Sequence, residues 1–110
     1  MGKIKLYSNE SVKRVIAFIP PGHQHVRVII ELKDGVIILH EASIAGILRA
    51  YIDVVTHPSR RAVELVSTKL PKSVRKQGYA EAQLIESDRS EDEVLRDAIE
   101  LWSNAELITG

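Results

Sequence analysis

The sequence predicts an α+β fold in which one antiparallel sheet carries helices on one of its faces. Three observations predict it: stretches of strand-like alternation, an Asp-Gly hairpin signal, and two helix-length apolar patterns. Their order, β-α-β-β-α-β followed by an extra C-terminal helix, is the ferredoxin-like order. With 110 residues the chain suits one domain, made of a βαββα half (1–56) and a helix-strand-helix extension (57–110).

The first elements predicted are a strand and a short helix. Residues 3–7 alternate polar and apolar side chains, as a half-buried strand does. Ser8-Asn9-Glu10 resembles a helix N-cap. Apolar side chains then follow at the i, i+3, i+4, i+7 spacing of one helix face: Val12, Val15, Ile16 and Ile19. A strand over residues 15–19 is the alternative, and we favour the helix because of the cap. Pro20-Pro21-Gly22 ends this element.

A β-hairpin is the clearest local signal. Residues 26–33 and 36–41 flank Asp34-Gly35, a dipeptide that type I′ turns favour because both central residues need a positive φ. A two-residue turn at this point places Glu31 opposite Ile38 and Ile29 opposite His40. One face of the hairpin is then apolar and is expected in the core; it consists of Val26, Val28, Ile30, Leu32, Ile37 and Leu39.

The helix expected over residues 42–56 is the most informative element. Its polar positions form one narrow stripe, made of Ser43, Gly46, Arg49 and Asp53. The rest of the circumference is apolar, and a two-layer monomer would leave several of its large side chains in water. The sequence therefore predicts a homo-oligomer, most simply a dimer. The expected interface residues, each contributing about 1.5–3 kcal/mol on burial, are Ile47, Leu48, Tyr51 and Ile52.

The C-terminal half begins at Pro58, which ends the preceding helix and starts another over Ser59–Leu70. A strand is the alternative for this segment. A loop over residues 71–78 leads to a strand over Tyr79–Glu86. Ser90-Glu91-Asp92-Glu93 is a capping-box pattern, and it opens an amphipathic helix that runs to Trp102.

Three histidines are the candidate metal ligands. His23 and His25 lie on one side of an extended segment, and the hairpin brings His40 to the same side, near Glu31. Neutral imidazoles in this arrangement suit zinc or another divalent ion. The alternative is that they are exposed loop and strand-edge residues. The chain has no cysteine, which excludes thiolate zinc sites and cysteine nucleophiles. We find no catalytic set or phosphate-binding glycine loop, and we predict no cofactor apart from this ion.

Charge is divided unevenly along the chain. Residues 1–76 hold 13 Lys and Arg against 6 Asp and Glu, a net charge of +7, and residues 77–110 hold 2 against 9, a net charge of −7. Such a division is typical of a nucleic-acid-binding face beside an acidic tail, or of two halves that attract each other. Aromatic residues for base stacking are scarce, so any contact would be to the phosphate backbone. The candidate residues are Arg60, Arg61, Lys69, Lys72, Arg75 and Lys76.

Residues 3–56 resemble the small dimerising subunit of the KEOPS tRNA-modification complex, the Pcc/CTAG family. The shared features are a short strand that ends at a capped helix, a hairpin closed by a glycine-containing turn, and an apolar helix that starts with small residues, here Ala42 to Leu48. The family usually has an Arg before the position of Gly46 and an Asn near position 49, where this chain has Ala45 and Arg49. The resemblance implies a non-catalytic dimeric scaffold.

These observations favour a non-catalytic oligomeric subunit or binding module, with a scaffold role in an RNA-modification assembly as one form of it. The alternatives are an RNA or DNA binder that reads the backbone, and a metal-dependent enzyme that uses the histidines. The N-terminus has no apolar signal core and no apolar run reaches about 18 residues, so we expect a cytoplasmic protein without a membrane partner. Abundant Ile and Val with few neutral amides are compatible with a thermophilic source.

Overall fold

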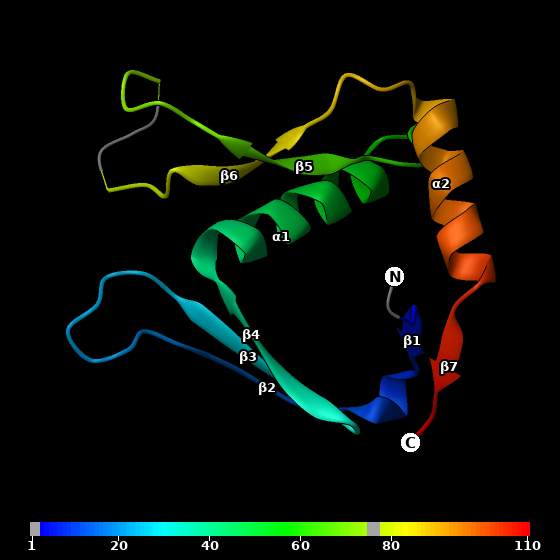
Figure 1. Ribbon diagram of the computed structural model, residues 1–110, viewed down its shortest axis with the longest axis horizontal. Helices are drawn as coiled ribbons and strands as arrows, with labels where there is room; N and C mark the ends of the chain where they lie inside the picture. The colour runs from blue at the N-terminus through cyan, green and yellow to red at the C-terminus, as the bar shows by residue number, and fades with distance from the viewer. Residues whose placement is uncertain (1–2, 75–77) are drawn as a thin grey trace. The chain divides into compact units, whose positions relative to one another are not determined.

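The computed structural model describes residues 3–74 and 78–110, and within them it shows an α+β protein with two helices and three small sheets (Figure 1). The elements are β1 (Lys5–Tyr7), a 3-10 turn (Asn9–Ser11), β2 (Val12–Phe18), β3 (Arg27–Leu32), β4 (Gly35–His40), α1 (Glu41–Thr56), β5 (Leu65–Lys69), β6 (Ala82–Glu86), α2 (Glu91–Ser103) and β7 (Glu106–Ile108). The sheets are β1-β7, β2-β3-β4 and β5-β6. The α+β class is confirmed, but the described strands do not form one ferredoxin-like sheet.

The chain folds as two compact units. The first unit comprises the chain up to Glu41 together with Arg96–Gly110, and the second unit comprises Ala42–Leu95. The first unit therefore holds the three-stranded sheet and the β1-β7 pair, and the second holds most of α1 and the β5-β6 hairpin.

In the first unit, the prediction of a helix over residues 12–19 is wrong, because this segment forms β2. It pairs antiparallel with β3, with Val15 opposite Ile30 and Ala17 opposite Val28. The supposed cap, Ser8, makes no capping hydrogen bond with its side chain. Instead the fully buried Ser11 hydroxyl lies within hydrogen-bonding distance of the Ile108 carbonyl oxygen. Pairing with β3 therefore outweighs a helical spacing that extends over only eight residues.

The hairpin of β3 and β4 is confirmed, but its turn is one residue earlier than expected. Lys33 and Asp34 form the turn, so that Glu31 lies opposite Val36 and Arg27 lies opposite His40. Gly35 does not have a positive φ, so this is not the type I′ turn that the Asp-Gly pair favours. Because the pairing moves by two residues, the same side chains still share a face. That face is only partly covered in the structure.

The turn is positioned by contacts from β1 and from the 3-10 turn that follows it. The Asp34 carboxylate accepts hydrogen bonds from the Lys5 ammonium and the Tyr7 hydroxyl, both at 2.9 Å. The Lys33 backbone N–H donates to the Ser11 carbonyl oxygen at 2.8 Å. The bond from Lys5, followed by that from Tyr7, holds the pKa of Asp34 below its usual value. These contacts between distant segments explain why the turn departs from its local preference.

We predict that Asp34→Asn lowers the urea midpoint of unfolding at pH 7. The midpoint of the variant should also change less than that of the wild type when the pH is lowered. The pKa of Asp34 is lower in the folded chain than in the unfolded chain, so the ionised carboxylate stabilises the fold. This contribution to stability is complete above the unfolded pKa of about 3.9 and is lost as the pH falls through the folded pKa. The difference between wild type and variant should therefore be larger at pH 7 than at pH 3. Asp88→Asn, at an exposed loop position, is the control. A constant difference at both pH values would contradict the prediction.

The second unit contains a further correction. The helix expected over residues 59–70 is absent, and residues 65–69 form β5, as the alternative interpretation held. It pairs antiparallel with β6, with Leu65 opposite Glu86 and Lys69 opposite Ala82. The start of α2 follows the capping-box prediction: the Ser90 N–H donates to Glu93 Oε1 at 3.3 Å and the Glu93 N–H donates to Ser90 Oγ at 3.2 Å.

Helix α1 lies against the β5-β6 hairpin (Figure 1), and two residues of its small and polar stripe, Gly46 and Arg49, make contact with it. Gly46 is buried, and a Cβ atom at this position would lie 2.6 Å from Leu84 Cδ1 and 3.0 Å from Leu84 Cβ. One turn further along, the Arg49 guanidinium donates to the Leu84 carbonyl oxygen at 2.5 Å. Gly46 is thus required by close approach and not by its own backbone conformation.

We predict that Gly46→Leu destabilises the second unit by about 1–3 kcal/mol or more, because the added side chain overlaps Leu84. The exposed neighbour Ala45→Leu is the matched control, since it adds a similar side chain to the same helix without that contact. Urea unfolding followed by circular dichroism measures both variants. Equal midpoints for the two would show that the close approach of α1 and β6 does not limit the side chain at position 46.

Candidate functional site

The surface of α1 opposite Gly46 is the first candidate site. We call it the apolar face of α1; its members are Ile47, Leu48, Tyr51, Ile52 and Val55, which are 45–64% exposed. All four residues expected at an oligomer interface belong to it. A globular helix normally buries its apolar side and exposes its polar side. Helix α1 does the reverse, so its apolar face can bind another apolar surface.

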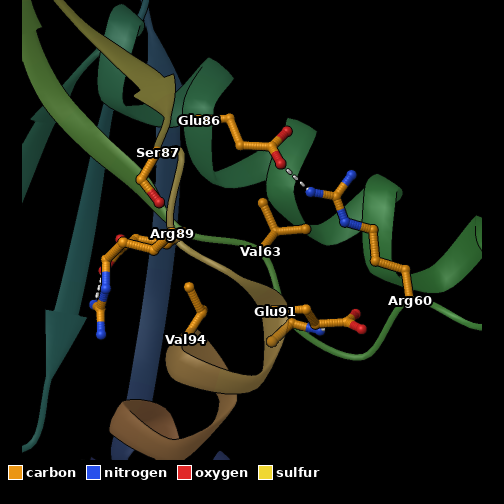
Figure 2. Close-up of a pocket in the computed structure, with 9 residues that line it drawn as sticks. Arg60, Val63, Glu86, Ser87, Arg89, Glu91 and Val94 are labelled. Carbon is orange, nitrogen blue, oxygen red and sulfur yellow. Dashed lines mark hydrogen bonds and ion pairs between the residues drawn. The ribbon is translucent and has the colours of Figure 1, made fainter.

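The second candidate site is a pocket of about 410 Å³ in the second unit (Figure 2). The segment after α1, the end of β6, the following loop and the first turn of α2 together form it. The lining residues are Arg60, Ala62, Val63, Glu64, Glu86, Ser87, Arg89, Glu91 and Val94. Val94 is among the few buried residues of the described chain, so the pocket borders a buried position of this unit.

Both guanidinium groups of the pocket are paired. Arg60 forms an ion pair with Glu86, which Figure 2 shows as a dashed line. Arg89 Nη1 lies 3.1 Å from Glu64 Oε2. The other oxygen of this carboxylate, Glu64 Oε1, is buried and has no hydrogen-bond partner among the described residues.

Glu91 joins the first turn of α2 to the segment after α1. Its carboxylate accepts the backbone N–H of Arg61 at 2.7 Å and that of Ala62 at 3.4 Å. The hydrogen bond from Arg61 is the main cause that holds the pKa of Glu91 below its usual value. The charged groups of the pocket therefore hold three segments of the second unit together.

We predict that Arg89→Met lowers the stability of the chain by about 1–3 kcal/mol, because it leaves the largely buried Glu64 carboxylate without its cation. The double variant Arg89→Met/Glu64→Gln should recover part of the loss, since the amide carries no charge. Urea unfolding of the wild type, both single variants and the double variant gives the coupling free energy. A coupling near zero would mean that the ion pair does not stabilise the fold.

The three candidate metal ligands lie in the first unit. His25 Nδ1 is 3.4 Å from Glu41 Oε1, and His40 is opposite Arg27 in the sheet. His23 follows the turn after Pro20. Within residues 3–74 and 78–110, no group of three His, Cys, Asp or Glu side chains is arranged to share a metal ion. The structure therefore does not bring these histidines together as a ligand set.

The candidate nucleic-acid residues are partly neutralised. Arg60 pairs with Glu86, and Lys69 Nζ lies 3.4 Å from Glu81 Oε1. Arg61 and Lys72 are exposed, while Arg75 and Lys76 lie outside the described residues. Both acidic partners come from the acidic C-terminal segment, so the two charge blocks do attract each other locally.

No helix in the described part of the chain is long and apolar enough to cross a membrane. Comparisons with protein-family models, with curated proteins and with solved structures find no match. Sequence patterns predicted the apolar face of α1, because its members recur at helical spacing. They missed the pocket, because its charged residues are scattered over more than thirty positions and only the β5-β6 pairing brings them together.

Proposed function

We propose that this chain is a non-catalytic subunit that acts by self-association through the apolar face of α1. One observation carries the proposal: α1 packs Gly46 and Arg49 against β6 and leaves Tyr51 and its apolar neighbours exposed. A contiguous apolar surface of this kind is typical of protein–protein interfaces.

The free energy gained by burying the apolar face of α1 supports an oligomer, but it also limits how tightly the copies can bind. About half of each side chain in the apolar face is already covered, so complete burial adds roughly 0.7–1.5 kcal/mol for each of them. Ten such side chains in a dimer contribute about 7–15 kcal/mol, and association costs about 4–15 kcal/mol. The two quantities are of the same order. A tight assembly therefore needs contacts beyond this helix.

Two other functions have less support. A protein that reads nucleic-acid backbones needs accessible cations, and Arg60 and Lys69 are in ion pairs. The resemblance to the KEOPS subunit implies a helix where this chain has β2. The observed fold therefore gives no support to a scaffold role in RNA modification. We restrict the proposal to self-association.

We predict that the wild-type chain is at least dimeric at micromolar concentration and that Tyr51→Arg raises its dissociation constant about 100-fold, which corresponds to about 2.7 kcal/mol. The charged side chain would lie at the centre of the apolar face, where a partner excludes water. Light scattering over a concentration series measures the mass.

Thr56→Arg is the matched control, because Thr56 is exposed on α1 but outside the apolar face. It should leave the mass unchanged. A monomeric wild type would overturn the proposal. So would a Tyr51→Arg variant that keeps its mass but unfolds at lower urea concentration, because this face would then be covered within the chain.

A further inference from the structure

Strand β4 is an unprotected sheet edge. The order β2-β3-β4 leaves one side of β4 and one side of β2 without a neighbouring strand. The residues that flank a two-residue turn form a hydrogen-bonded pair, and such pairs alternate with pairs whose backbone groups point outward. Since Leu32 pairs with Gly35 at this turn, the outward groups of β4 belong to Val36, Ile38 and His40. No hydrogen bond to these groups is found in the described part of the chain outside the β3-β4 ladder.

The two edges of this sheet differ in how they resist further pairing. Edge strands of monomers usually carry charges, a proline or a bulge, since a regular apolar edge pairs with another strand. Strand β2 has two such features, the basic pair Lys13-Arg14 and an irregular register between Val12 and Arg14. Strand β4 has neither. Its residues 36–39 are Val-Ile-Ile-Leu, and Val36, Ile37 and Ile38 are 46–60% exposed on both faces of the strand.

We propose that β4 pairs antiparallel with β4 of a second copy of this chain, so that two three-stranded sheets become one continuous sheet. Two copies related by a twofold axis perpendicular to the sheet have corresponding faces on the same side of the joined sheet. Residues that lie opposite each other must then point to the same face, and this restricts the possible registers. One such register places Ile37 opposite Ile37 of the second copy. Val36 and Ile38, whose backbone groups point outward, then exchange the hydrogen bonds.

A second copy suits this edge better than an unrelated strand, because the edge is complementary to itself. In the register centred on Ile37, no charged residue faces a like charge, and only apolar residues meet between Gly35 and Leu39. The Asp34 carboxylate at each end is already bound by Lys5 and Tyr7 of its own chain, so it adds no pairing across the edge. The next acidic residue, Glu41, already accepts the Val26 backbone N–H.

The inference goes beyond the α1 interface and does not rest on it. Edge pairing supplies backbone hydrogen bonds and apolar contacts from the first unit, whereas the apolar face of α1 belongs to the second unit. The two surfaces are therefore separate contacts between copies, each made by a different unit.

Cysteine cross-linking tests the pairing directly, because the chain has no cysteine of its own. Opposite residues in a non-hydrogen-bonded antiparallel pair have Cα atoms ~4.5 Å apart, and disulfides need about 4.4–6.8 Å. Ile37→Cys should therefore form a covalent dimer under mild oxidation, at least 10-fold faster than Val15→Cys on the exposed edge strand β2. Ile38→Cys should also be slow, because position 38 faces position 36 in this register. Equal rates for all three variants, or faster reaction at position 38 or 15, would overturn the proposal.

A second variant removes the pairing and keeps the hairpin. The N–H of Ile38 points away from β3, so Ile38→Pro should retain the β3-β4 ladder and block the second copy. Circular dichroism checks that the Ile37→Cys/Ile38→Pro chain is folded, and its cross-linking should fall to the rate of Val15→Cys. Cross-linking that persists in this folded variant would refute edge pairing. In the Tyr51→Arg background the Ile37→Cys dimer should still form, so the two interfaces can fail separately.

Discussion

The missing side chain at Gly46 is the constraint on which the second unit depends. It allows the backbone of α1 to approach Leu84 so closely that a larger residue fits only if the Leu84 side chain shifts. Arg49 then reaches the Leu84 carbonyl oxygen and fixes the rotation of the helix about its own axis. Once the small stripe faces the hairpin, helical geometry places Tyr51 and its apolar neighbours on the opposite side. One glycine thus decides which face of α1 is available to a partner.

The charged residues of the second unit have a mainly structural role. Each pair joins segments that are far apart in the sequence: Arg60 with Glu86, Arg89 with Glu64, and the Glu91 carboxylate with the backbone after α1. These pairs are partly exposed, so each contributes modestly, but together they hold the start of α2 beside the hairpin. The division of the sequence into a basic and an acidic part reflects this pairing, since Glu86 and Glu81 neutralise Arg60 and Lys69.

Sequence patterns predicted what local interactions determine. The capping box at Ser90, the apolar helix after Glu41 and the hairpin around Asp34 all follow from spacings of a few residues. Distant contacts account for the errors. Strand β2 forms because β3 pairs with it, and the hairpin turn moves because Lys5 and Tyr7 bind Asp34. The three residues of β7 carry no strand signal, and they become a strand only by parallel pairing with β1.

If copies of this chain assemble through α1 as proposed, the lifetime of the chain depends on its concentration. A newly made subunit would then display its apolar face until another copy covered it, and exposed apolar surface is what chaperones bind and what drives aggregation. Copies that remain alone would be removed or trapped, while assembled copies would be protected by mass action. Steady-state abundance would then rise more steeply than the rate of synthesis.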